Sequence, residues 1–460
     1  MTPLSLRSIA FHLEGTLLGE DCVVDTVGID SRTLPRGGLF VALIGERNDG
    51  HDFIPSLVGR AEAVICQRKV DADIPQIVVL DTVEALGKLA KFSVDARSTP
   101  LIKIAITGSV GKTTTKELCG HVLNAALPTH RTQGNKNNHL GLPLTMLSLH
   151  PDDTAMICEM GMNAKGEISY LSSLLRPQYA IVTNIGTAHI GRLGSREEIR
   201  TAKLELCENM DRNGVLIVDG NEPLLRDKEA FSLYGGRRVI FVGKGANCDV
   251  RQTALAMHGD ECSFRIASMF GEERDFSLPI TGAHNAANAL YAYTLAKLLN
   301  LSDEDIQSGF TAYQPIGMRQ HIYEKNGIKY IADCYNAGPE SMIASLRVLC
   351  ENPAPAGGRK VAVLGDMLEL GSFSEAAHRR VGATFATLGG DVLYTLGENA
   401  RFIAASAQEN GAKEVYSFSN SGTLVEALKY TLRQKDTVLF KASNGMHLDK
   451  VIEALHVNGE

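Results

Sequence analysis

Residues 104–115 read IAITGSVGKTTT, an apolar strand that runs into a glycine-containing turn, a lysine and three hydroxyl side chains. Backbone N–H groups of such a turn can point at phosphate oxygens, and the positive end of the following helix adds to the attraction. We expect Lys112 to reach the β- and γ-phosphates of a nucleotide and the Thr113 hydroxyl to bind Mg²⁺. The eight-residue pattern begins with a glycine where Ile106 stands, so this is a shortened loop; the alternative is a plain glycine-rich helix entry. The predicted nucleotide-binding residues are Gly108, Ser109, Val110, Gly111, Lys112, Thr113 and Thr114.

Segments with the patterns of strands and helices alternate along most of the chain. Apolar strand-like runs occur at 101–108, 155–160, 179–186, 214–219, 238–243, 330–335, 360–366, 392–397 and 437–443. Helical patterns lie between them, at 112–125, 197–210, 285–299, 374–388 and 424–433. Because buried strands joined by helical crossovers form parallel sheets, the predicted fold class is α/β.

The length of 460 residues exceeds what one hydrophobic core normally organises, so we expect three domains. The first boundary is predicted near residue 83, before an amphipathic helix at 83–92. The second is predicted near 313, where Tyr313-Gln314-Pro315 ends a helix and the alternation starts again. The domains are then 1–83, 84–313 and 314–460. The central one is a P-loop ATPase domain with a parallel sheet, and the last is Rossmann-like with a loop at 351–358.

The composition excludes several classes of protein. The formal net charge is −7 and no basic run occurs, which argues against a nucleic-acid partner. No N-terminal leader pattern and no membrane-length apolar run is present, so we expect a cytoplasmic protein without a membrane partner. Nine cysteines are scattered without a CxxC pair, which favours reduced thiols over disulfides or a zinc site.

Polar residues follow several of the predicted strands, at the sheet edge where open α/β sheets bind ligands. Glu159 is either a second metal ligand or a helix cap, and His189 is either part of the site or a structural histidine. The segment 201–205, which contains Lys203, has the pattern of a solvated helix face. The amide-rich stretch 133–143 is equally consistent with a turn and with a substrate-binding loop.

Together these segments resemble the Mur ligase family of ATP-dependent amide-bond-forming enzymes, and the resemblance extends along the whole chain. Further matching motifs are DSR at 30–32, GLFVALIGE at 38–46, DGHDF at 49–53, DCYNA at 333–337 and LGDMLELG at 364–371. An Asp-Asn-Pro-Arg tetrapeptide, typical of family members that add diaminopimelate, is absent. Within the family, this pattern implies ligation of D-alanyl-D-alanine to UDP-N-acetylmuramoyl-tripeptide, in peptidoglycan precursor synthesis.

The resemblance implies ATP and two Mg²⁺ ions as cofactors and a monomeric enzyme. Lys112 would bind phosphate, Thr113 and Glu159 would hold the first Mg²⁺, and His189 and Lys203 the second, with Lys203 as a carbamate formed with CO₂. These four, Lys112, Glu159, His189 and Lys203, are the implied catalytic residues. The implied nucleotide contacts outside the loop are Asn285, Asn288, Arg319 and Asp333. The N-terminal domain would hold the UDP-sugar, and the implied substrate-binding residues are Ser31, Arg32, Asp49, Gly50, His51, Asn137, Asn138 and Asn336.

Three positions depart from the family pattern, and two other functions compete with it. Gly338 stands where asparagine is common, and Ala442 and Asn444 stand where glycine and arginine are common, which affects contacts from the third domain rather than the ATP site. A folylpolyglutamate-type or another amino-acid-adding ligase would share the phosphate loop but not the N-terminal motifs. A regulatory P-loop ATPase would form no bond, and its ATP turnover would not require a carboxylate and an amine together.

Overall fold

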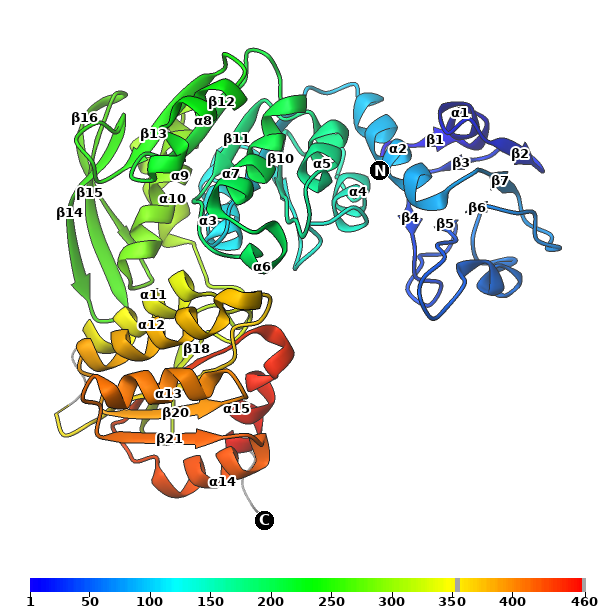
Figure 1. The fold of residues 1–460 in the computed structure, drawn as a ribbon. Helices are drawn as coiled ribbons and strands as arrows, with labels where there is room; N and C mark the ends of the chain where they lie inside the picture. Colours follow the sequence, from blue (N-terminus) through cyan, green and yellow to red (C-terminus); the bar gives the residue numbers. More distant parts are fainter. Residues whose placement is uncertain (352–355, 457–460) are drawn as a thin grey trace.

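The computed structural model describes residues 1–351 and 356–456. Residues 352–355 and 457–460 lie outside the described part, and the loop predicted at 351–358 falls largely among them. Three large sheets, each with its own helices, follow one another along the described part of the chain, and a small two-stranded pair accompanies the first (Figure 1). The central part lies between the other two, which are well separated from each other in this view. The architecture is α/β, as predicted, while the boundaries at 83 and 313 stay predictions.

The N-terminal part contains a five-stranded sheet with the order β2-β7-β6-β5-β4. Only the β2–β7 pair is antiparallel. Its strands are β2 (Thr16–Leu18), β4 (Val27–Gly28), β5 (Leu39–Val41), β6 (Ala63–Cys66) and β7 (Gln76–Val78), and a separate pair joins β1 (Leu4–Ser5) to β3 (Val23–Val24). Its helices are α1 (Leu6–His12), the 3₁₀ helix η1 (Gly50–Leu57) and α2 (Thr82–Asp95). Asp81 starts α2 by accepting hydrogen bonds from the N–H groups of Val83 and Glu84, which caps the helix.

The central sheet has nine strands in the order β16-β15-β14-β13-β12-β11-β8-β10-β9. The parallel strands are β8 (Ile102–Thr107), β9 (Thr129–Arg131), β10 (Ala155–Glu159), β11 (Tyr179–Val182), β12 (Val215–Asp219) and β13 (Arg238–Gly243), joined by β14 (Val250–His258). Two antiparallel strands, β15 (Glu261–Ser268) and β16 (Gly271–Leu278), complete the edge. Strands β14 to β16 were not predicted from the sequence.

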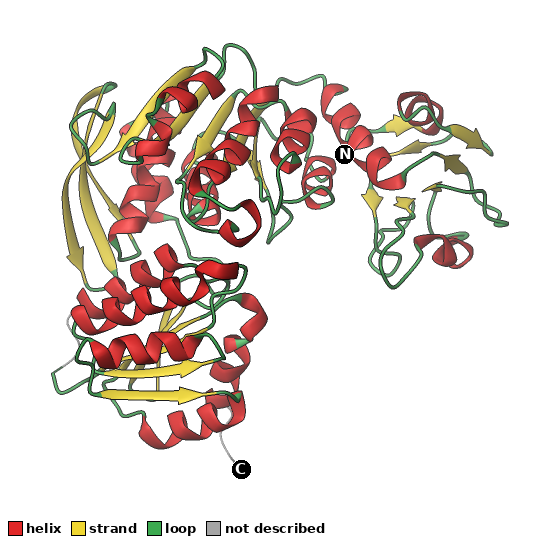
Figure 2. Cartoon of the chain, in the orientation of Figure 1, coloured by secondary structure: helices red, strands yellow, loops and turns green. Residues whose placement is uncertain are grey.

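Helices cover both faces of this sheet (Figure 2). They are α3 (Lys112–Asn124), α4 (Gly141–Leu147), α5 (Glu167–Leu175), α6 (Ile190–Leu193), α7 (Arg196–Leu204), α8 (Lys228–Leu233), α9 (Ala283–Leu298) and α10 (Asp303–Thr311), with 3₁₀ turns η2 (Glu205–Asn209) and η3 (Pro223–Leu225). The helix predicted at 197–210 is therefore two elements, α7 and η2. Strand β8 lies between β11 and β10, and Ile104, Ala105 and Ile106 are fully buried. Its carboxyl end therefore opens the phosphate loop at an interior position of the sheet.

The third part has a six-stranded sheet with the order β17-β18-β22-β19-β20-β21. The strands are β17 (His321–Lys325), β18 (Ile328–Ala332), β19 (Lys360–Gly365), β20 (Val392–Leu396), β21 (Glu414–Phe418) and β22 (Thr437–Lys441), of which β17 alone is antiparallel to its neighbour. The helices are α11 (Pro339–Glu351), α12 (Ser374–Thr387), α13 (Ala400–Glu409), α14 (Ser421–Thr431) and α15 (Leu448–His456), with 3₁₀ turns η4 (Gly371–Phe373) and η5 (Asn444–Met446). Strands β17 and β21 were not predicted.

The nine cysteines are all free thiols, and all but Cys22 are buried. Burial raises the pKa of Cys66 and of Cys350 to about 11, so these thiols stay protonated at neutral pH. In the described part of the chain, no helix combines the length and apolarity needed to span a bilayer.

Candidate active site

The phosphate loop joins β8 to α3, and two glycines allow its shape. Gly108 has a φ of 149°, and a Cβ built on it would lie 1.9 Å from Thr183 Oγ1. Gly111 has a φ of 82°, and its Cβ would lie 2.8 Å from Asn288 Oδ1. Any larger residue would meet both the left-handed backbone penalty and a neighbouring side chain. The loop is therefore packed tightly against the segments that follow β11 and begin α9.

The end of β11 holds the middle of the loop by side-chain hydrogen bonds. The N–H of Val110 donates to Asn184 Oδ1 at 3.0 Å, and its carbonyl accepts from Asn184 Nδ2 at 3.0 Å and from Thr183 Oγ1 at 2.6 Å. The N–H of Gly186 donates to Ser109 Oγ at 2.9 Å. Thr183 and Asn184 thus act as supports of the loop. The sequence signal was present, because both residues lie toward the end of the strand-like run predicted at 179–186, but sequence analysis gave them no role.

Lys112 folds back over the loop. Its Nζ donates to the carbonyl of Gly108 at 2.8 Å and lies 3.4 Å from that of Ser109. Burial lowers the pKa of Lys112; the nearby Glu159 carboxylate opposes this effect, and the charge of Arg319 adds to it. The ammonium is thus held where a phosphate anion would relieve its lack of solvation.

Glu159 ends β10 and is 3% exposed, and both of its carboxylate oxygens accept hydrogen bonds. Oε2 accepts from Thr113 Oγ1 at 2.8 Å, and Oε1 accepts from Asn137 Nδ2 at 2.9 Å. The helix-cap alternative is wrong, because both partners are side chains. A hydroxyl and a carboxylate are the oxygen ligands that Mg²⁺ prefers. Among the described residues no group of three or more His, Cys, Asp or Glu could hold a metal, so phosphate oxygens would have to complete such a site.

His189 and Lys203 come from the loop and helix that follow β11. The left-handed His189 has a φ of 65°, and its Nδ1 lies 2.9 Å from Glu369 Oε2 in the third part of the chain. Burial lowers the pKa of His189, Glu369 opposes this, and the charges of Lys203 and Lys112 add to the lowering. His189 therefore lies within electrostatic reach of Glu369, Lys203 and Lys112.

Lys203 is only 1% exposed, so the solvated-face alternative is wrong. Within the described residues its amine has no hydrogen bond or ion pair. Burial lowers the pKa of Lys203 well below its usual range, and the nearby charge of Lys112 lowers it further. The amine is consequently far more readily neutral than that of a surface lysine.

Residues of the third part close the site from one side. Asn285 Nδ2 donates to the carbonyl of Thr281 at 2.8 Å and to Gln320 Oε1 at 2.9 Å. Arg319 stacks over the ring of Tyr335 at 4.0 Å. Asn285 therefore reaches across the junction of α9 with the third part to Gln320, the residue next to Arg319. Gln320, which has a φ of 49°, was not predicted as a site residue, and no sequence pattern marks it.

Asp333 and Asn336 are committed to contacts within the third part. Asp333 Oδ2 accepts from Lys441 Nζ at 2.7 Å and from Ser345 Oγ at 2.6 Å. Lys441 also donates to the backbone carbonyl of Asn336 at 3.1 Å, while the Asn336 side chain accepts from the N–H of Ala337. Asn138 similarly accepts backbone N–H groups in its own loop, including that of Gly141 at 2.8 Å. Asn137 contacts Glu159, so the amide-rich stretch is both a turn and part of the site.

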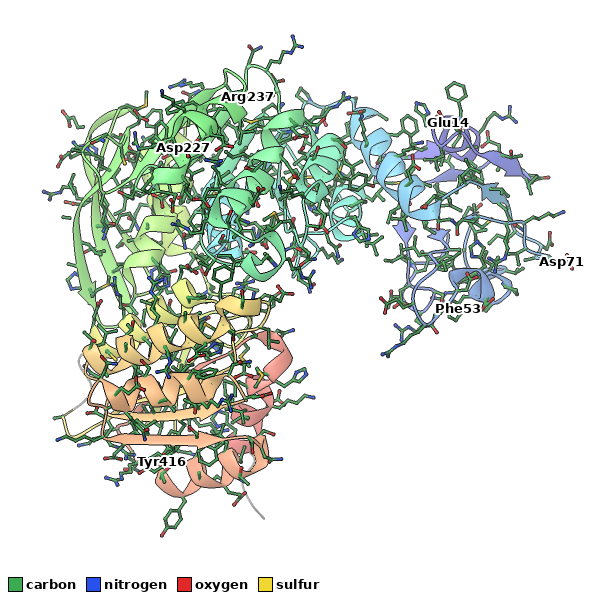
Figure 3. The ribbon with its side chains drawn as sticks, viewed as in Figure 1. Glu14, Phe53, Asp71, Asp227, Arg237 and Tyr416 are labelled. Atoms are coloured by element: carbon green, nitrogen blue, oxygen red, sulfur yellow. The ribbon has the colours of Figure 1, made fainter. Side chains whose placement is uncertain are left out.

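The N-terminal candidates form two further sets of contacts, one around Arg32 and one around His51. Arg32 makes a two-point contact with Asp30, at 3.0 and 2.7 Å, and this lowers the pKa of Asp30 to about 2. Ser31 lies in the same turn. Figure 3 marks Phe53 in this part and Tyr416 in the third part, far apart in the view.

Both ring nitrogens of His51 have hydrogen-bond partners. Its Nε2 accepts from the N–H of Gln67 at 2.8 Å, so Nδ1 carries the proton that faces Asp49 Oδ1 at 2.6 Å. Hydrogen bonds from Arg68 and then His51 hold the pKa of Asp49 well below its usual range. Gly50 lies between them, and its Cβ would come within 2.7 Å of the Leu43 backbone. The loop that follows β5 is therefore rigid and carries an anion with fixed partners.

Three family models match successive parts of the chain. They are "Mur ligase family, catalytic domain" at residues 23–93, "Mur ligase middle domain" at 106–296 and "Mur ligase, glutamate ligase domain" at 318–444. Together they span most of the sequence and all of the site described above. The chain belongs to the Mur ligase family.

Several full-length relatives are named as D-alanyl-D-alanine-adding ligases or as MurF. The UDP-N-acetylmuramoyl-tripeptide–D-alanyl-D-alanine ligase of Bacillus subtilis is 36% identical over 464 residues, covering 99% of each chain. A crystal structure of MurF from Acinetobacter baumannii has 32% identity and a TM-score of 0.89, with 99% of each chain covered. MurF from Thermotoga maritima in complex with ADP has 27% identity and a TM-score of 0.82, covering 94% of this chain and 97% of that one.

Proposed function

We propose that this protein joins D-alanyl-D-alanine to UDP-N-acetylmuramoyl-tripeptide with ATP, giving ADP, phosphate and the UDP-linked pentapeptide. The observation that carries the proposal is the grouping of Lys112, Glu159 and the buried Lys203, since a phosphate loop alone would serve any nucleotide switch. Full-length similarity to ligases of this name supports the choice of substrates.

The first half of the reaction activates a carboxylate. The terminal carboxylate oxygen of the tripeptide attacks the γ-phosphorus of ATP, and the bond to the β-γ bridging oxygen breaks, leaving ADP and an acyl phosphate. Lys112 would neutralise charge on the transferring phosphoryl group, and the loop N–H groups would hold the remaining phosphates. Gly108 and Gly111 let the backbone approach closely enough to do so.

Thr113 and Glu159 fit a first Mg²⁺, and His189 with Lys203 would hold a second. Mg²⁺ would neutralise phosphate charge and align the two reacting oxygens. A neutral Lys203 amine can attack CO₂ and lose a proton, which gives an anionic carbamate in place of a cation. The low pKa of Lys203 favours this reaction, because only the neutral amine has the required lone pair.

The second half forms the amide. The neutral dipeptide amine attacks the acyl carbon and loses a proton to solvent, and the tetrahedral intermediate collapses as the acyl C–O bond breaks and phosphate leaves. Arg319, at the junction with the third domain, lies close enough to Lys112 to influence its charge and would face the phosphates. The third domain would exclude water, because hydrolysis of the acyl phosphate would waste ATP.

The three parts of the chain divide the work. We assign UDP-sugar binding to residues 1–83 through Ser31, Arg32 and the Asp49–His51 cluster, ATP binding to 84–313, and closure to 314–460. The Asn285, Asn288 and Asp333 contacts to nucleotide, and the Asn137, Asn138 and Asn336 contacts to substrate, are part of this proposal. A monomer working in the cytoplasm, where ATP is available, stays a prediction.

A phosphate-release assay tests this function. UDP-muramoyl dipeptide, UDP-muramoyl tripeptide and a folate are each offered as donor with D-alanyl-D-alanine, single amino acids or glutamate, and product masses are recorded. We expect release only with the tripeptide and the D-dipeptide together. Release with a dipeptide donor and one amino acid would favour another Mur ligase, and glutamate addition to a folate would favour a folylpolyglutamate-type ligase. Phosphate release that does not depend on either donor or acceptor would favour a regulatory ATPase.

A further inference from the structure

The motif at 364–371 has no role in the reaction as described so far, yet it reaches the central domain. It leaves β19 and turns at Glu369, whose φ of 66° is left-handed. Glu369 Oε2 lies 2.9 Å from His189 Nδ1, and Oε1 lies 3.5 Å from the guanidinium of Arg192. Two residues with left-handed backbones, 180 positions apart in the sequence, thus face each other across the domain junction.

The backbone around Glu369 is held firmly from within the third domain. The N–H of Met367 donates to Nε2 of the buried His378 at 3.0 Å, and the N–H of Leu368 donates to Ser443 Oγ at 3.0 Å. Asp366 accepts the N–H of Ala400 at 2.6 Å. These bonds fix the turn without any help from the central domain, so Glu369 is presented as part of a rigid surface.

Gly191 is the point where this surface docks. A Cβ on Gly191 would lie 2.7 Å from the carbonyl oxygen of Glu369 and 2.8 Å from the backbone nitrogen of Gly371. Because both atoms belong to the backbone, neither can swing away. A second contact supports the same segment, since Thr187 Oγ1 donates to the carboxylate of Glu340 at 3.0 Å. The stretch from Thr187 to Arg192 therefore contacts the third domain at two places, Glu340 and the turn at Glu369.

The ring nitrogen Nδ1 of His189 requires a hydrogen-bond acceptor. Its buried Nδ1 has no hydrogen bond in good geometry within the described residues, and the Glu369 carboxylate is the acceptor in closest reach. A metal-binding imidazole is ordinarily oriented by a carboxylate or carbonyl at its other ring nitrogen, which fixes the tautomer. We propose that Glu369 is a positioning residue, which directs Nε2 of His189 toward the metal site from the third domain once that domain has docked at Gly191. The inference rests on the proposed function, in which His189 serves the second Mg²⁺.

Mg²⁺ dependence provides the first test. In the phosphate-release assay with saturating ATP and both substrates, Glu369→Ala should raise the Mg²⁺ concentration for half-maximal rate about tenfold or more, the usual effect of losing such a partner. Glu369→Gln keeps an acceptor oxygen, so its Mg²⁺ concentration for half-maximal rate should lie between those of the parent and of Glu369→Ala. Glu375→Gln is the matched control, because Glu375 is an exposed carboxylate of the same domain that pairs, among the residues the structure describes, only with Arg379.

Ring NMR of histidine provides a readout that needs neither metal nor turnover. In ¹⁵N-histidine-labelled, metal-free protein, the His189 ring nitrogens should change their shifts in Glu369→Ala and in Gly191→Ala, and stay unchanged in Glu375→Gln. Parent-like ring signals together with a parent-like Mg²⁺ requirement in Glu369→Ala would overturn the inference, whether or not Gly191→Ala folds. If the parent itself releases no phosphate, the proposed function fails, and the ring signals still decide whether Glu369 holds His189.

Discussion

At the scale of single residues, burial decides what a charged side chain does. The sequence around Lys203 is typical of a polar helix face. In α7, however, Lys203 is buried, and the nearby positive charge of Lys112 further lowers the pKa of its amine. Glu159 is similarly buried, but both of its carboxylate oxygens accept hydrogen bonds from side chains. The two groups therefore differ in their partners rather than in their depth.

Replacing Lys112 tests the phosphate loop. Lys112→Ala should lower the ligation rate by at least about 100-fold, because the charge that builds on the phosphoryl group loses its cation. The midpoint of thermal unfolding should stay the same or rise, since a poorly solvated ammonium is removed. Both are measured on one preparation, by phosphate release and calorimetry. A folded variant within tenfold of the parent rate would contradict the assignment.

Replacing Lys203 tests the carbamate. Lys203→Ala should lose most activity, because the space then lacks an anionic oxygen. Added formate or acetate should restore part of the rate in this variant and do little for the parent. Lys228→Ala, which changes an exposed lysine of α8, is the control that should match the parent with and without formate. Full activity of Lys203→Ala without added anions would remove Lys203 from the site.

At the scale of elements, the sequence predicts best what depends on local pattern. The strand, turn and helix predicted at 104–115 are confirmed as β8, the phosphate loop and α3, because an apolar run and glycines are direct sequence signals for them. Strand β16 could not be recognised, since its residues before Phe276 are exposed and charged and show no alternation. The pairing of His189 with Glu369, and of Asp333 with Lys441, could not be read either, because each joins distant segments through the fold.

The glycines of the loop give a prediction about an element. Gly108→Ala should reduce stability by roughly 1–3 kcal/mol and weaken ATP binding, because its Cβ would overlap the Thr183 hydroxyl. Gly338→Ala is the control, since nothing lies within 4 Å of its built Cβ. Thermal unfolding and calorimetric titration with ATP compare the two. Equal behaviour of both variants would mean that the loop relaxes more easily than its packing implies.

At the scale of the whole molecule, binding and chemistry are assigned to different domains. The Asp30–Arg32 and Asp49–His51 contacts lie in the N-terminal domain, while Lys112 and Glu159 lie in the central one. The third domain touches the central domain at Glu369 and also through an ion pair between Lys329 and Asp260, at the turn between β14 and β15. A long substrate would connect the first two domains, and the third would meet it only at its reactive end.

This separation predicts selective effects on substrate binding. Arg32→Ala should raise KM for the UDP-linked donor several-fold and leave KM for ATP and the dipeptide unchanged, because the lost contact is uniform binding far from the reacting carboxylate. Arg7→Ala, which removes another exposed arginine of the same domain, should change none of the three constants. Initial rates with each substrate varied in turn give the values. A comparable rise in KM for ATP would place Arg32 elsewhere in the mechanism.

Because nearly all of the thiols are buried, the number that react with a reagent reports whether the protein is folded. Eight of the nine cysteines are buried and Cys22 is half-buried, so a thiol-reactive dye added to the native protein should find at most one slow site. Burial raises the pKa of Cys22 as well, to about 11, which slows that site further. Opening of any one domain would release its own thiols and no others. Labelled peptides, sorted by position, would therefore record which part of the chain unfolds first.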